Sequence, residues 1–221
     1  MPESAGSRSP GASISPTGSV LLGMLTSGDE MSGYDIKKWF NWSTRFFYPS
    51  PAFSQIYSEL KRLEQQELVR SRVEGGTRSR RLYTITDAGR DAVVAWANDE
   101  PVEPPTLKHP PMMRMIFGHL LNPGRLRDVL TAHVDNMEQI RRSAETEARW
   151  AGEQPAWAYA RLALSWSERY YANERELALQ MLKELDDVEK TFAGRTDAEK
   201  FPVREYWYEV ERRVAAEEDQ G

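Results

Sequence analysis

The 221-residue chain contains no cysteine, which excludes disulfide bonds, thiolate metal sites and cysteine nucleophiles together. No apolar stretch approaches the roughly 20 residues needed to cross a bilayer, so no membrane partner is expected. Residues 1–15 are rich in Ser, Pro and Gly and contain no hydrophobic block, which is typical of a disordered tail rather than a secretion signal. These absences predict a cytoplasmic protein.

Signatures of catalysis are also missing. The chain contains no His-Glu-x-x-His, no phosphate-binding glycine–lysine loop and no nucleophile elbow. Its three histidines, His109, His119 and His133, fall on separate expected elements without the spacing of metal ligands. We therefore expect no enzyme, no metal site and no cofactor.

The net charge of −5 is unevenly distributed along the chain. Residues 16–97 carry +2, residues 98–221 carry −7, and the tail is neutral. A weakly basic N-terminal half is compatible with double-stranded DNA as a partner, and the acidic half must then point away from the duplex. Because so modest a charge predicts weak binding at a single site, we expect a homodimer that covers two half-sites.

Residues 50–89 are the most informative part of the chain. Their first apolar side chains recur at helical spacing and predict a core-facing stripe: Phe53, Ile56, Tyr57, Leu60 and Leu63. Ser50 and Pro51 have the residue types of a helix cap and a first helical position. Two short strands follow around a glycine turn that is rich in arginine (Arg72, Arg78, Arg80, Arg81). A helix followed at once by a basic hairpin is the order of a winged helix-turn-helix.

The remaining pattern is helical. Ser15-Pro16 opens a first helix, Ser32 caps a second over about residues 33–42, and Thr86 caps a fourth that carries Val93, Val94 and Trp96. Beyond an acidic, proline-rich segment, a short helix over residues 112–121 is expected. Two long helices then follow, with predicted seams at Leu126, Leu130, His133, Met137, Ile140 and Ala144, and at Ala163, Ser167, Tyr170, Glu174, Leu177, Met181 and Leu185.

These elements predict a mainly α fold with a small β-hairpin. Residues 1–15 form the disordered tail, residues 16–98 a winged helix-turn-helix DNA-binding domain, and residues 99–111 a linker. Residues 112–190 form an antiparallel, coiled-coil-like helical dimerisation domain. Residues 191–221 form a C-terminal extension with one amphipathic helix, outlined by Tyr206, Trp207, Val210 and Val214.

The N-terminal half resembles the PadR family of bacterial transcriptional regulators, in the branch with a full-length helical C-terminal domain. The resemblance covers residues 20–97 strongly and residues 112–190 only in pattern. It is carried by Leu-Leu-Gly-Met-Leu at 21–25, Ser-Gly-Tyr at 32–34, Gln55-Ile56-Tyr57, the segments 59–64 and 68–69, Arg80-Arg81, Tyr83, Ile85-Thr86, Ala88-Gly89-Arg90 and Trp96.

The resemblance implies a homodimeric winged-helix repressor or activator whose third helix and wing contact an inverted repeat. It also implies that the C-terminal helices exchange with those of a partner. Two positions depart from the family pattern: Glu67 stands where the family usually has glycine, and Ser79 where it often has proline. A non-glycine residue in a left-handed conformation costs about 1 kcal/mol, so the turn into the wing is expected to differ.

The residues expected to contact DNA are Tyr34, Ser50, Ser54, Gln55, Tyr57, Ser58, Lys61, Arg62, Arg78, Ser79, Arg80, Arg81 and Tyr83. Gln55 is the candidate for reading adenine through its amide, with a phosphate contact as the alternative. Tyr34 and Tyr57 suit either the core or a backbone phosphate. The alternative to DNA contact is that the polar residues form a solvated helix face and a hairpin tip that is charged for solubility.

Aromatic residues accumulate in the C-terminal half. Trp157, Trp166, Tyr170, Tyr171 and Trp207, with Met137 and His133, suit either a pocket for a small aromatic effector or a dimer interface. Aromatics at helical spacing favour the core or the interface. Two other functions stay open: a winged-helix module that binds proteins, and a small-molecule-binding protein that uses the aromatic cluster.

Overall fold

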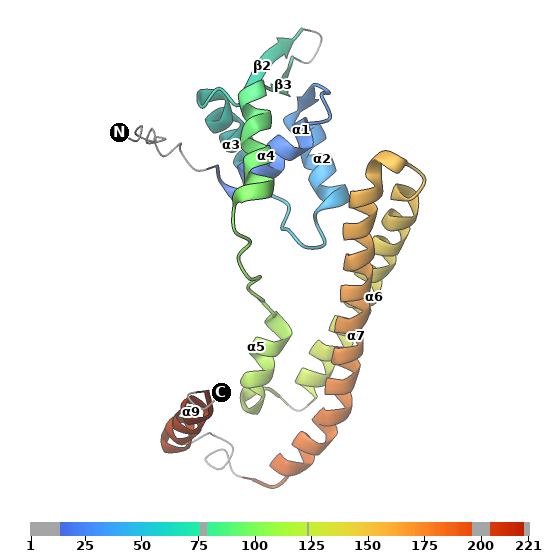
Figure 1. Cartoon of the computed structure of the whole chain (residues 1–221). Helices are drawn as coiled ribbons and strands as arrows, with labels where there is room; N and C mark the ends of the chain where they lie inside the picture. Colours follow the sequence, from blue (N-terminus) through green and yellow to red (C-terminus); the bar gives the residue numbers. More distant parts are fainter. Residues whose placement is uncertain (1–13, 76–78, 123, 196–203, 219–221) are drawn as a thin grey trace, which may run out of the picture. The chain divides into compact units, whose positions relative to one another are not determined.

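The computed structural model describes residues 14–75, 79–122, 124–195 and 204–218 (Figure 1). The chain divides into two compact units, residues 1–105 and residues 106–221. The first unit contains α1 (Pro16–Leu25), β1 (Met31–Ser32), α2 (Gly33–Ser43), α3 (Phe53–Gln65), β2 (Val69–Glu74), β3 (Arg80–Ile85) and α4 (Asp87–Asp99).

The sheet of the first unit has three antiparallel strands in the order β1-β3-β2. Strands β2 and β3 form the expected hairpin, which projects from the helices as a wing (Figure 1). The sequence pattern missed β1, because its two residues are too few to show an alternation. Met31 of β1 pairs with Tyr83, so β3 is the central strand of the sheet.

The core of this unit follows the predicted helical stripes only in part. Ile56, Leu60 and Leu63 of α3 are fully buried, together with apolar residues of α1 and α2. Phe53 and Tyr57 were predicted to face the core, but 45 % and 46 % of their surfaces are exposed. Both lie in the first two turns of α3. There the core buries only the side of the helix that carries Ile56 and Leu60.

Three of the four expected helix caps are present. The Ser15 hydroxyl accepts the Gly18 N–H at 2.9 Å. Ser32 and Asp35 form a reciprocal capping box, whose hydrogen bonds hold the pKa of Asp35 below its usual value. The Thr86 hydroxyl accepts the Gly89 N–H at 3.0 Å.

The cap of α3 was predicted wrongly. Helix α3 begins after Ala52 rather than Ser50, and the Gln55 side-chain carbonyl accepts the Ala52 N–H at 2.8 Å. The reason is a tertiary contact. The Lys37 ammonium donates to the Ser50 hydroxyl at 2.7 Å and to the Pro51 carbonyl at 2.6 Å, which holds this segment outside the helix.

The turn from α3 to the wing keeps a left-handed residue without glycine. Glu67 has a φ of 60°, and the Leu68 N–H donates to the Leu63 carbonyl at 3.0 Å. Such a residue costs about 1 kcal/mol relative to glycine. The Thr86 hydroxyl donates to the Glu67 carbonyl at 2.8 Å and helps to hold the turn.

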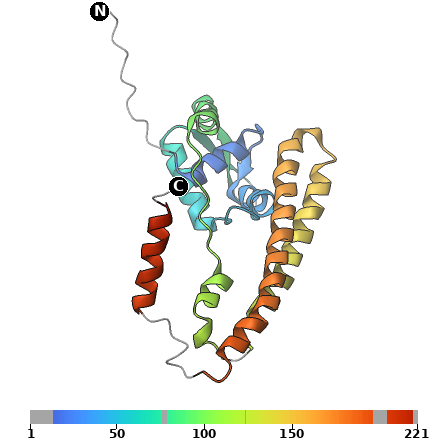
Figure 2. The ribbon, with the colours of Figure 1, turned by 60° about the horizontal axis from the view of Figure 1, so that its bottom comes forward.

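The second unit is helical. It contains α5 (Pro110–Ile116), the short 3-10 helix η1 (Gly118–Leu120), α6 (Arg125–Ala151), η2 (Pro155–Trp157), α7 (Ala158–Phe192) and α9 (Arg204–Glu218). Helices α6 and α7 lie side by side as a long antiparallel pair (Figures 1 and 2). The expected linker ends earlier than predicted, since Pro110 and Pro111 form the first turn of α5 instead of excluding a helix.

The seam between α6 and α7 combines larger apolar residues with small ones. Ala144, Ala148 and Ala151 of α6 are buried, as are Ser167 and Ala178 of α7. The Ser167 hydroxyl donates to the Ala163 carbonyl at 2.9 Å and is satisfied within its own helix. Small side chains allow two helices to approach closely. Several larger residues predicted for the seam are buried (Leu126, Leu130, Met137, Leu185), whereas Tyr170 and Leu177 are exposed at its rim.

Candidate nucleic-acid interface

The outer face of α3 is polar and free of core packing. Ser54, Gln55, Ser58 and Lys61 are exposed, while Ile56, Leu60 and Leu63 fix the opposite face in the core. Serine hydroxyls and an ammonium group can donate hydrogen bonds to the phosphate oxygens of DNA and to acceptor atoms on the base edges. The geometry of this face therefore suits a helix that enters a major groove.

Gln55 is partly committed to the helix start. Its carbonyl oxygen accepts the Ala52 N–H, which leaves its amide NH2 as the free group. A bidentate contact with adenine uses the oxygen and the nitrogen together. Such readout would require this oxygen to accept from adenine as well as from Ala52, whereas donation to a phosphate oxygen would use the amide NH2 alone.

An exposed aromatic group flanks the start of α3. The ring of Tyr34 stacks on that of Phe53 at 6.4 Å between centroids. Tyr57 lies against Gly33, where an added Cβ would come within 2.6 Å of its ring. Glycine at this position thus allows the first turn of α2 to pack directly on an outward-facing residue of α3.

The wing arginines are paired with acids. Arg72 donates to Glu30 at 2.7 Å, Arg80 pairs with Glu74, and the guanidinium of Arg81 lies 3.6 Å from the Glu64 carboxylate. Ion pairs this exposed contribute little stability and exchange readily for phosphates. Their glutamates reduce the positive potential that the sequence suggested for the wing. Arg78 lies outside the described residues, and Ser79 is exposed.

Lys61 and Arg62 are neighbours with different surroundings. Lys61 is exposed and forms no ion pair within the described parts of the chain. Arg62 donates to Glu59 at 2.6 Å, and Glu59 also accepts the Ser15 hydroxyl at 2.7 Å. Glu59 thereby links Arg62 to the cap of α1, which favours a structural role for Arg62 over the predicted DNA contact.

Two other predicted contacts involve side chains that are engaged elsewhere. The side chain of Tyr83 is only 5 % exposed and belongs to the core cluster of the first unit, so its predicted DNA contact is corrected to a role in the core. Burial also raises the pKa of Tyr83. The Ser50 hydroxyl is engaged by Lys37 and fixes the loop before α3.

The C-terminal candidates separate into two groups. His133, Met137, Tyr170 and Tyr171 line a hollow of about 570 Å³ within the second unit. Trp166 is more than half exposed on α7 and stacks on Tyr170 at 5.3 Å. Trp157 lies exposed at the start of α7, and Trp207 packs on Tyr208 of α9.

The histidines are the clearest feature that the sequence missed. His109 Nε2 lies 2.6 Å from Glu174 Oε1, and His133 Nε2 lies 2.9 Å from the same oxygen. Burial raises the pKa of Glu174, but the two histidine hydrogen bonds outweigh it and lower the pKa overall. The residues are 24 to 65 positions apart, so no spacing rule indicated that they meet.

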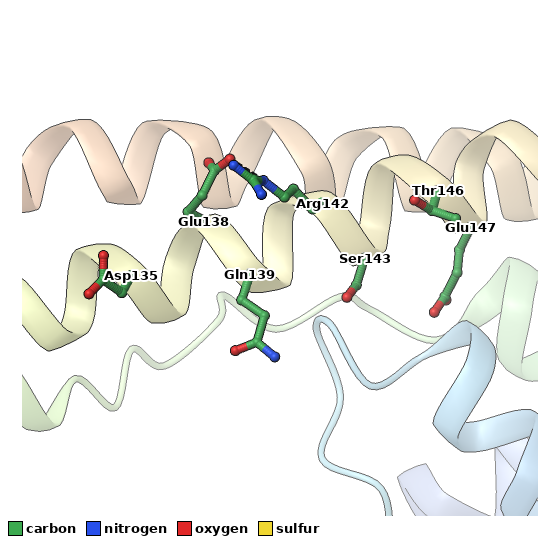
Figure 3. A pocket seen from close by; sticks show the side chains of 7 residues that line it. All are labelled: Asp135, Glu138, Gln139, Arg142, Ser143, Thr146 and Glu147. Atoms are coloured by element: carbon green, nitrogen blue, oxygen red, sulfur yellow. Dashed lines mark hydrogen bonds and ion pairs between the residues drawn. The ribbon is translucent and has the colours of Figure 1, made fainter.

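A polar face of α6 carries a shallow surface hollow (Figure 3). Its side chains all project from one helix and do not converge on a common point, so it offers no catalytic geometry. Glu138 on this face accepts from Arg141 at 2.9 Å and Arg142 at 2.6 Å, and lies 3.7 Å from Arg175 of α7. These hydrogen bonds lower the pKa of Glu138 to about 2.

Glu138→Gln should lower the melting temperature of the helical unit at neutral pH and have a much smaller effect at pH 2. The reason is that a carboxylate with a depressed pKa stabilises the fold above its ordinary value of 4.5. This stabilisation is lost as the pH falls toward 2. Circular dichroism melts of both proteins from pH 7 to pH 2 measure the difference, which 1 M salt should reduce. An equal difference at every pH would contradict the prediction.

Among the residues that the structure describes, none of the helices combines the length and apolar character needed to span a bilayer.

Comparison with known proteins identifies the N-terminal unit. Residues 21–95 match the model of the transcriptional regulator PadR-like family. The negative transcriptional regulator PadR of Bacillus subtilis (strain 168) is 34 % identical over 100 residues, which are 44 % of this chain and 54 % of the relative. The chain thus spans about half the length of that curated relative.

Solved structures share the fold over a longer region. Bacillus subtilis PadR in complex with operator DNA is 24 % identical, with a TM-score of 0.65 over 76 % of this chain and 98 % of its own. A PadR-like transcriptional regulator from Bacillus cereus is 25 % identical, with a TM-score of 0.65 over 77 % and 98 %. The same Bacillus subtilis protein in complex with p-coumaric acid is 24 % identical, with a TM-score of 0.60 over 76 % and 97 %.

These relatives are transcriptional regulators rather than enzymes. The family match covers α3 and the strands of the wing. Residues 21–95 are therefore similar to the PadR-like family of transcriptional regulators.

Proposed function

We propose that this protein is a cytoplasmic DNA-binding transcriptional regulator that occupies an inverted-repeat operator as a homodimer and represses by occlusion. The observation that carries the proposal is the exposed polar face of α3, which directly precedes the wing within a PadR-like domain. The relative from Bacillus subtilis supports it, since that protein is a negative regulator and is known in complex with operator DNA.

The homodimer is supported by the surface of α7. Trp166 and Tyr170 form a stacked pair on the outside of the helix, and Leu177 is half exposed further along it. Large exposed aromatics in such a row are typical of interface cores. Residues 112–190 would then act as the dimerisation domain, and two-fold symmetry would match the two half-sites of a palindrome.

A small aromatic effector is the second part of the proposal. The hollow lined by Tyr170, Tyr171 and Met137 has aromatic walls of the kind that planar ligands pack against. The complex of Bacillus subtilis PadR with p-coumaric acid supports a ligand of this class. An effector bound beside α7 would change the spacing of the two winged helices and thereby release the operator.

Lys61→Ala tests the DNA-binding face. Operator duplexes are first selected from a random pool, and their affinity is then measured over a range of salt concentrations. Each lost phosphate contact should reduce the salt slope by about 0.9, so a dimer should lose about two units. Ser58→Ala should weaken binding without changing this slope, because a hydroxyl carries no charge.

Arg62→Ala is the matched comparison. Because Arg62 binds Glu59 inside the unit, its removal should lower the melting temperature and leave the salt slope unchanged. If Lys61→Ala leaves the salt dependence of DNA affinity unchanged, Lys61 does not contact a phosphate. If no duplex is selected with salt-dependent affinity, the proposal fails, and the protein-binding module and the small-molecule-binding protein are the functions left.

A further inference from the structure

We propose that His109, His133 and Glu174 form a binding site for a divalent transition-metal ion such as Zn²⁺. The three side chains come from the start of α5, from α6 and from α7. Their ligand atoms all lie within 4.8 Å of one another. Within the described residues this is the single cluster of three histidine or carboxylate ligands that could hold an ion.

The donor set selects the class of metal. Two imidazole nitrogens and one carboxylate oxygen suit Zn²⁺ and its transition-metal neighbours, whereas Mg²⁺ and Ca²⁺ prefer oxygen ligands throughout. Zn²⁺ binds such ligands at about 2.0–2.2 Å, so tetrahedral ligands stand roughly 3.4 Å apart. The two N–O distances of 2.6 and 2.9 Å require the Glu174 carboxylate to withdraw by less than about 1 Å, which its flexible side chain allows.

The surroundings are those of a partly enclosed site. The side chains of the two histidines are each 12 % exposed and that of Glu174 is 15 % exposed. The cluster lines the hollow of about 570 Å³, so a fourth ligand has access from solvent. Asp128 lines the same hollow, as do the cations Lys108, Arg114 and Arg125.

The proposed ion would be coupled to the start of α5. His109 caps this helix, because its Nδ1 accepts the Met112 N–H at 3.2 Å. With Nδ1 acting as the acceptor, a neutral His109 carries its proton on Nε2 and donates it to Glu174. A metal on Nε2 shifts that proton to Nδ1, which can then no longer accept from Met112. Metal binding therefore removes the side-chain cap of α5, which is the first helix after the winged-helix unit.

Titration of the metal-stripped full-length protein tests the site. Zn²⁺ is added in competition with a chromophoric chelator, and Co²⁺ is added to record the visible absorption of the bound ion. One equivalent of each metal should bind per chain. Glu174→Gln keeps the size of the side chain and one acceptor oxygen but loses its charge, and should weaken Zn²⁺ binding at least about 100-fold. His133→Gln should do the same, with circular dichroism confirming that both variants are folded.

His119→Gln is the matched control, since it removes the histidine that lies outside the cluster and should leave the affinity unchanged. Equal Zn²⁺ affinity in Glu174→Gln and the unaltered protein would overturn the proposal, as would the absence of any Co²⁺ absorption. A regulatory effect of the ion rests on the proposed DNA-binding function, whereas the titration does not. If the metal binds and no operator is found, the site stands and the proposed function falls.

Discussion

Gly89→Ala should lower the free energy of unfolding of the winged-helix unit by about 3 kcal/mol. A Cβ at this position would lie 2.1 Å from the Leu68 carbonyl oxygen and 2.9 Å from a side-chain carbon of Ile85. The first of these atoms belongs to the backbone, so the clash cannot be relieved by rotating a side chain. The start of α4 would have to move away from the start of the wing.

This movement would break several hydrogen bonds together. The Thr86 N–H donates to the Leu68 carbonyl at 3.1 Å, and the Thr86 hydroxyl connects the Glu67 carbonyl to the Gly89 N–H. These bonds hold the left-handed turn at Glu67 against the first turn of α4. Urea denaturation of the full-length protein, followed by far-UV circular dichroism, measures the loss of stability.

Gly23→Ala is the appropriate control. Gly23 is also helical, but no heavy atom lies within 4 Å of an added Cβ. Alanine there should raise the stability by up to about 1 kcal/mol, because glycine is the weaker helix former. If the two substitutions shift the urea midpoint equally and in the same direction, the close approach of Gly89 to Leu68 is not the reason for glycine at that position.

Trp166→Ala should raise the dissociation constant of the proposed homodimer about 30-fold or more. A central aromatic residue of an interface contributes about 2 kcal/mol or more to binding, and 1.4 kcal/mol is a factor of ten. In the isolated chain 54 % of the Trp166 surface is exposed, and its ring stacks on Tyr170. The fold of one chain therefore depends little on Trp166, and the cost should appear in association.

Analytical ultracentrifugation over a range of concentrations measures this effect, with circular dichroism to show that helix content is unchanged. The effector-pocket interpretation predicts a different outcome. In that case the substituted protein stays dimeric at the same concentrations and loses only its response to an aromatic effector. A dimer of unaltered affinity would therefore remove Trp166 from the interface.

Much of the first unit could be predicted because its signals are local. Ser15, Ser32 and Thr86 each cap a helix through a bond to a residue three positions away, and such bonds are visible as sequence patterns. The position of α3 was predicted well, but its cap was misplaced by two residues. The cause is Lys37, which lies 13 positions from Ser50 and which no local pattern connects to it.

The functional surfaces were harder to predict. The arginines of the wing were recognised, whereas their partners were not, since Glu30 lies 42 residues from Arg72. Tyr83 was placed among the DNA contacts because the sequence does not show which face of β3 packs on the core. Lys61 and Arg62 also differ in their surroundings, because Arg62 contacts Glu59 and, through it, the cap of α1. The spacing of charges on α3 does not show this difference.

The sequence alone determined the fold class, the order of the main helices and of the hairpin, and the family resemblance, because these follow from periodicity, caps and turn residues within a few positions of one another. Only the tertiary structure decided which charged groups are already paired, which aromatics are exposed, and that His109, His133 and Glu174 meet. Those properties depend on which faces of distant elements come into contact, and that is set by the packing of the whole unit rather than by any short segment.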